Sequence, residues 1–168
     1  MVIASGTCVG LSSNFKPLID QGLTGQNTFW VQYLKDVNDE EFKNDDFVKL
    51  YHATAKGQGL DDTNGQYATG WVFAWYLTEI VKEAATSNGG INRANLMLAA
   101  RAINKPMPLV LSTVTNKMDG VKDGYLNEAG RIVRYIVKDP TKLGTAFPQG
   151  DVINREGQLQ TFKKSLEA

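Results

Sequence analysis

Apolar and polar positions follow two different periods along the chain, and each period predicts one kind of element. Runs rich in strand-forming residues predict strands at 1–4, 28–34, 109–111 and 131–137. Apolar stripes at helical spacing predict helices over about 11–22, 42–51, 66–85 and 92–103. Strands that alternate with helices in this way predict an α/β fold.

The first apolar run, Val2-Ile3-Ala4, predicts a buried parallel strand. Such a strand needs neighbours on both sides. A helix follows it after a turn of small residues, and Gly22 is a typical helix stop. We therefore expect an α/β unit that forms the later part of a larger fold.

The helix over 66–85 carries the strongest apolar pattern of the chain. Its apolar residues cover much of the circumference, which predicts deep burial. The next helix is predicted to begin after Asn92, a good N-cap residue. After Asp139-Pro140 we expect an extended tail with one short strand near 151–153.

Composition and charge narrow the possible partners. The 168 residues carry 18 Lys and Arg against 18 Asp and Glu, so no field attracts nucleic acid. A single Cys and a single His exclude an internal disulfide framework and make a metal centre or cofactor unexpected. No apolar run approaches the ~18 residues of a membrane span, and no signal peptide is expected at the first residues.

Two acidic segments imitate cation sites. The segment 119–130 matches a calcium-binding loop at several positions, but Val121 and Gly130 stand where carboxylates are required. We interpret it as a hairpin connection. The acidic residues between 36 and 46 are interpreted as a solvated helix start, where carboxylates suit the helix dipole.

His52 and Cys8 leave an enzymatic alternative open, in which a nucleophile pairs with a base. No nucleophile-elbow motif supports it, so a non-catalytic His is the favoured interpretation. The turn 5–8 follows the first strand, where open α/β sheets bind ligands, although a plain turn is equally compatible. Tyr67, Trp71 and Trp75 share one helix face, which is more typical of core packing than of a pocket.

The order of these features resembles a known family. Tyr67-Ala68-Thr69-Gly70-Trp71 opens the aromatic helix, 91–96 begins a helix after Gly, and 130–135 forms a late strand. Together with 1–22, they resemble the substrate-binding proteins of ABC importers, in the branched-chain amino acid and amide group. The resemblance runs from residue 1 to about 137.

The resemblance implies part of a two-lobed, periplasmic-binding-protein-like fold. Each lobe would be a three-layer αβα sandwich with a mainly parallel sheet, and crossing strands would form the hinge. The implied division is a second-lobe segment at 1–60, hinge and first-lobe helices at 61–108, return strands at 109–138 and an extended tail at 139–168.

The resemblance also implies a solute site in the cleft between the lobes and no catalysis. Thr7 and Cys8 stand where the family often places an aromatic ligand contact, and no acidic residue directly follows 29–31. The implied class of solutes is therefore broad and comprises an amino acid, an amide or a short organic acid. The implied ligand-binding residues are Ser5, Thr7, Cys8, Gln32, Tyr33 and Asp62.

In the complete protein the implied partners are this solute and an importer permease, and the implied location is periplasmic or lipid-anchored at the cell surface. Two alternatives remain: a hydrolase-like enzyme that uses Cys8 and His52, and an oligomerising interaction module. For this chain alone we expect either an intertwined or swapped homo-oligomer or a structure in which these elements repack, because half a lobe cannot close its own core.

Overall fold

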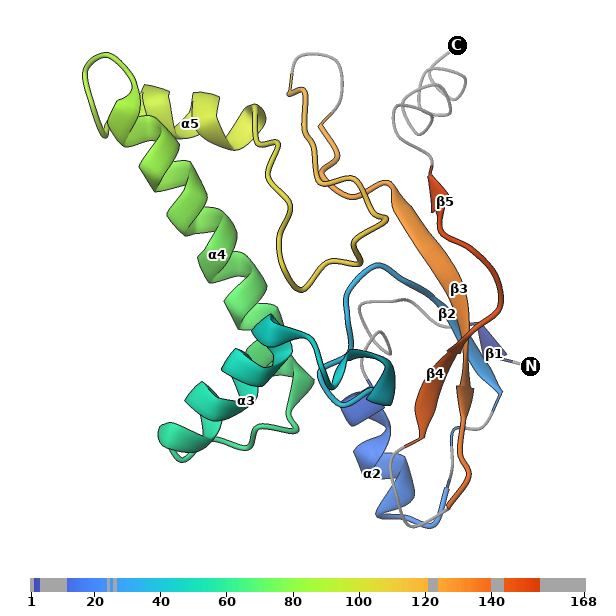
Figure 1. Ribbon diagram of the computed structural model, residues 1–168. Helices are drawn as coiled ribbons and strands as arrows, with labels where there is room; N and C mark the ends of the chain where they lie inside the picture. The colour runs from blue at the N-terminus through green and yellow to red at the C-terminus, as the bar shows by residue number, and fades with distance from the viewer. Residues whose placement is uncertain are drawn as a thin grey trace.

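The computed structural model describes residues 2–3, 12–23, 25, 27–120, 124–139 and 144–154. A sheet lies on one side of the molecule and a group of helices on the other (Figure 1). The strands are β1 (Val2–Ile3), β2 (Thr28–Gln32), β3 (Ala129–Ile136), β4 (Thr145–Pro148) and β5 (Ile153–Asn154). The helices are η1 (Ser12–Phe15), α2 (Lys16–Ile19), η2 (Glu40–Phe42), α3 (Asp46–Gly57), α4 (Gly65–Thr86) and α5 (Arg93–Arg101). The predicted α/β class is confirmed.

The prediction of a mainly parallel sheet is wrong. The strand order is β1-β2-β3-β4, and β5 pairs with the start of β3. Only β1 and β2 are parallel, whereas β3 is antiparallel to β2, β4 and β5. The connection from β3 to β4 is short, and a short connection can join only antiparallel neighbours. The strand β4 itself was not predicted, since its residues were assigned to the extended tail.

The strand predicted at 1–4 is present as β1, but it is not buried between neighbours. It pairs with β2 alone, at the edge of the described sheet. Ile3 is 77% exposed. The apolar run therefore predicted the strand correctly, but the prediction that the strand is buried is wrong.

The two faces of the sheet differ sharply. One face carries Trp30, Val133 and Tyr135, which Phe15 of η1 covers, and we call this group the sheet core. The rings of Phe15 and Tyr135 stack with centroids 3.9 Å apart. The strand register places a second apolar set on the opposite, exposed face, which we call the outer face. The outer face comprises Ile3, Val31, Ile132, Phe147 and Ile153.

A second hydrophobic core lies among the helices and the segment 103–114. We call it the helical core; its fully buried members include Val48, Tyr51 and Leu109. The helix α4 contributes Ala68, Val72 and Tyr76 to it, at intervals of four residues. The predicted deep burial of this helix is wrong, because Phe73 and Leu77 occupy the other side and Phe73 is 70% exposed.

Side-chain caps fix the helix starts. The Asn92 side chain accepts a hydrogen bond from the Asn95 amide, as predicted for the start of α5. Asp45 accepts from the amides of Phe47 and Val48, so α3 begins at Asp46. This helix continues to Gly57, beyond the predicted end near residue 51. None of the described helices combines the length and hydropathy needed to cross a bilayer.

The strand predicted at 109–111 is absent. The Val110 amide donates to the Met107 carbonyl and the Val114 amide to the Leu111 carbonyl, so tight turns flank these residues. Only a single bridge between Leu34 and Val110 remains. A single antiparallel bridge joins Asn116 and Asn127 across the predicted hairpin connection, and residues 121–123 of that connection lie outside the described residues.

Candidate functional site

The structure places the predicted ligand residues in two groups. Ser5, Thr7 and Cys8 lie outside the described residues. Gln32 and Tyr33 lie where β2 leaves the sheet, and Asp62 lies in the connection between α3 and α4. The predicted ligand residues that the structure describes therefore lie on two connections, the one that follows β2 and the one between α3 and α4.

Residues 32–35 and 127–131 form the passage between the two cores, and we call it the crossover. After Gln32 the chain runs along the helical core: the Leu111 amide donates to the Tyr33 carbonyl at 2.9 Å, and the Lys35 amide to the Leu109 carbonyl at 2.8 Å. The returning segment leads from the bridge between Asn116 and Asn127 into β3. Both segments thus leave one core and enter the other.

An arginine fork lies at this crossover. Arg131 stands opposite Gln32 in the strand register, and its Nε donates to Gln32 Oε1 at 2.9 Å. Its two terminal nitrogens donate to the two carboxylate oxygens of Glu41, at 3.0 and 2.5 Å. The guanidinium carbon also lies 5.8 Å from the centroid of the Phe42 ring. A bidentate, charge-assisted pair of this kind holds η2 against the sheet.

The amide of Gln32 is only half satisfied. The residue is 2% exposed, and its Nε2 has no hydrogen-bond partner among the described residues. Turning the amide over does not help, because Nε2 would then face the Nε–H of Arg131, donor against donor. A buried donor without an acceptor is unfavourable and rare, so this atom marks a polar gap at the crossover.

Tyr33 faces the other core. Its half-buried side chain packs against the helical core. Since side chains alternate along an extended chain, Gln32 and Tyr33 point to different sides of the crossover. The two residues share a location, but only Gln32 joins the arginine fork.

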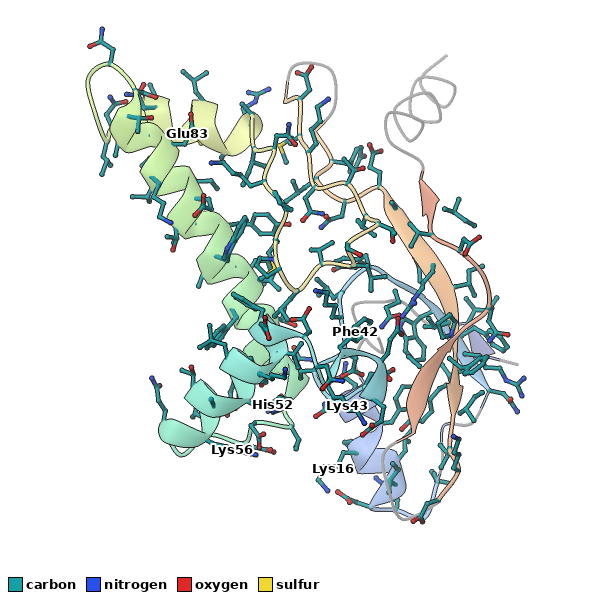
Figure 2. The ribbon with its side chains drawn as sticks, viewed as in Figure 1. Lys16, Phe42, Lys43, His52, Lys56 and Glu83 are labelled. Carbon is teal, nitrogen blue, oxygen red and sulfur yellow. The ribbon has the colours of Figure 1, made fainter. Side chains whose placement is uncertain are left out.

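Asp62 belongs to a separate cluster with His52 and Lys56. Figure 2 labels His52 and Lys56 on α3, with Phe42 nearer the strands. Asp62 Oδ2 lies 2.6 Å from His52 Nδ1 and 3.3 Å from Lys56 Nζ. Desolvation raises the pKa of the Asp62 carboxyl, but the hydrogen bonds from His52 and Lys56 outweigh it and hold that pKa below its ordinary value. The carboxylate therefore fastens the α3–α4 connection to α3.

Both ring nitrogens of His52 are engaged. Nε2 lies 2.8 Å from the Val37 carbonyl oxygen, which can only accept a hydrogen bond. Nδ1 faces the Asp62 carboxylate, also an acceptor when ionised. Both ring nitrogens thus face oxygen atoms of the fold, which hold the ring in place. The enzymatic alternative, which pairs His52 with Cys8, gains no support from the arrangement of His52.

The acidic segment 36–46 is only partly a solvated helix start. Asp45 caps α3 as interpreted, but Asp36 and Asp39 are buried. Desolvation raises the pKa of Asp39, and the charges of Asp36 and Glu41 raise it further, although hydrogen bonds from backbone amides oppose them. Within the described ranges, no group of three or more His, Cys, Asp or Glu side chains is placed to hold a metal ion.

The described pockets lie elsewhere. One of about 480 Å³ is lined by residues of α5 and the segment 102–120, including Leu98, Arg101 and Met118. A smaller one of about 210 Å³ lies between α4 and α5. Neither is lined by a predicted ligand residue or by a residue of the crossover.

Arg131 and Glu41 are the site residues that the sequence did not reveal. Arg131 was predicted only as one member of a strand, and Glu41 only as one of several solvated acidic residues. Their meeting depends on the pairing of β2 with β3, about 100 positions apart in the chain, and no local pattern encodes it. Comparisons of the chain with family models, with curated proteins and with solved structures found no match.

Proposed function

We propose that this chain is part of the solute-binding component of an ABC importer, which holds a small polar molecule between two α/β lobes. One observation carries the proposal: the described residues pack into two separate cores joined by the crossover. Gln32 and Tyr33, two of the implied ligand residues, lie at that crossover. In a two-lobed protein, crossing segments between the cores would serve as the hinge, and the cleft at a hinge is a usual place for a small ligand.

Binding at such a hinge needs no chemistry. A solute that contacts both cores has more affinity for the closed arrangement than for the open one, and it shifts the population toward closure. The docking of the closed form on a membrane permease, outside the cytoplasm, is part of the same proposal and derives from the family resemblance.

Two uncovered apolar surfaces also support the proposal. The outer face of the sheet and the Phe73 and Leu77 side of α4 are both exposed. Soluble monomers rarely leave such patches uncovered. In two-lobed proteins with three-layer αβα lobes, helices would cover the outer face and a sheet would cover this side of α4. We propose that both surfaces bind further parts of that architecture.

Calorimetric titration tests the function. A panel of amino acids, amides and short-chain acids should include at least one solute that binds, and Gln32→Ala should weaken its binding more than a change at exposed Lys43. A contradicting result would be the absence of binding together with turnover of an ester or amide substrate that His52→Ala abolishes.

A further inference from the structure

We infer that Gln32 and Arg131 form a subsite for the carboxylate of a solute, and that Glu41 occupies this subsite when no solute is bound. The inference rests on the proposed solute-binding function and narrows its ligand class to carboxylic acids. It is carried by two independent features of the crossover, the arginine fork and the unpartnered amide of Gln32.

The donor geometry of the fork matches a carboxylate. A guanidinium offers parallel donors that match the two oxygens of a carboxylate. Arg131 is fixed on three sides, by Gln32, by Glu41 and by the ring of Phe42. Its side chain is 13% exposed, whereas that of Glu41 is 41% exposed. Glu41 is thus the partner that can turn into water while Arg131 stays in place.

The fit of Glu41 is incomplete. Both of its oxygens are taken by Arg131, and Gln32 Nε2 is left without an acceptor. Nε2 belongs to the amide that already touches the guanidinium, so it lies beside the fork. A carboxylate that is not attached to η2 is free to place one oxygen on Arg131 and the other on Gln32 Nε2. Such a solute satisfies a buried donor that Glu41 does not.

One carboxylate replaces another beside Arg131, so the guanidinium keeps a charge-assisted partner while the carboxylate of Glu41 turns into water. A neutral amide of the same shape gains no such charge-assisted pair and competes poorly with Glu41. The subsite is therefore selective for acids over amides.

The test uses the full 168-residue chain and two matched probes, propionate and propionamide. Glu41→Gln removes the internal carboxylate, and its control is Glu40→Gln, whose carboxylate pairs with exposed Lys43 instead. By calorimetry, Glu41→Gln should bind propionate about tenfold more tightly than the parent chain does, because an internal competitor lowers the apparent affinity by the fraction of open sites. Glu40→Gln should not change it.

Nuclear magnetic resonance locates the effect. Propionate should shift the side-chain amide signals of Gln32 and the Nε–H signal of Arg131, and propionamide should not. Arg131→Lys should abolish propionate binding, whereas Arg134→Lys on the opposite face of β3 should preserve it. Thermal melting of each variant separates loss of binding from loss of fold.

Two results would overturn the inference. One is equal propionate affinity in Glu41→Gln and Glu40→Gln, and the other is an unchanged Gln32 amide signal at saturating propionate. If an amide or an amino acid from the panel still binds in those cases, the solute-binding function stands and only the carboxylate subsite fails. Absence of binding by every solute and variant contradicts both.

Discussion

At the scale of single residues, the crossover and its surroundings hold carboxylates of opposite behaviour. Asp39 is buried, and desolvation raises its pKa. The pKa of Asp62 is lowered, because hydrogen bonds from His52 and Lys56 outweigh its desolvation. The two groups therefore contribute to stability with opposite signs as the pH changes.

We predict that Asp62→Asn destabilises the protein near pH 7 and that Asp39→Asn stabilises it. The depressed pKa of Asp62 gives a contribution that is present above its unfolded value near 3.8 and is lost as the pH falls through the lower folded pKa. The raised pKa of Asp39 gives the reverse: its ionised form opposes folding, and protonation relieves this as the pH falls. Each change should amount to about 1 kcal/mol.

Urea denaturation between pH 2 and pH 7 measures both effects. The acid-side loss of stability should be shallower in Asp62→Asn and steeper in Asp39→Asn than in the parent chain. Exposed Asp46, which lies near Lys49 on the surface, provides the control as Asp46→Asn. Parallel pH profiles for all three variants would contradict the assignment.

At the scale of elements, two glycines have opposite surroundings. A Cβ on Gly130 in β3 would lie 2.5 Å from Val31 Cγ1 and 3.0 Å from the Gln32 carbonyl oxygen, a backbone atom that cannot move aside easily. A Cβ on Gly70 in α4 would meet nothing within 4 Å. Gly130 thus permits the close approach of β3 to β2 at the crossover.

We predict that Gly130→Ala lowers the free energy of unfolding by about 2 kcal/mol, through the overpacking of two paired strands. Gly70→Ala should raise it by roughly 0.5–1 kcal/mol, because alanine is the better helix former. Denaturant titration of the two variants gives both values. A destabilised Gly70→Ala together with a neutral Gly130→Ala would refute the packing described for both elements.

The elements with strong local signals were predictable. The run 28–34 indicated β2, the apolar stripe at 66–85 indicated α4, and Asn92 marked the start of α5. The predictions that failed concern segments whose structure depends on partners far away in the sequence. The residues of β4 carry a weak pattern and become a strand only because β3 offers them an edge, and the apolar residues 109–111 pack in the helical core without forming a ladder.

At the scale of the whole molecule, the uncovered surfaces determine how the chain behaves in solution. The outer face collects five exposed apolar side chains from five strands. Arg134 lies on the same face and is hydrogen-bonded to Asn27. A mostly apolar sheet face of this kind favours association with another surface.

We predict that the isolated chain self-associates through the outer face. Light scattering should give a mass above 18.5 kDa, and the double variant Ile132→Lys with Phe147→Lys should shift it toward the monomer. Leu50→Lys, at an exposed position of α3, is the control and should leave the mass unchanged. A monodisperse monomer for the parent chain would exclude this association.

The crossover also has a consequence for the order of folding. The buried members of the helical core all lie between Val37 and Val114, whereas the sheet core draws on Phe15, Trp30, Val133, Tyr135 and Ala146. During synthesis from the N-terminus, the helical core has all its residues about 30 positions before the sheet core does. Pairing of β2 with β3 closes a long loop of chain. A folded helical core within that loop shortens its effective length. We therefore expect the helical core to fold first and β2 to pair with β3 after it has formed.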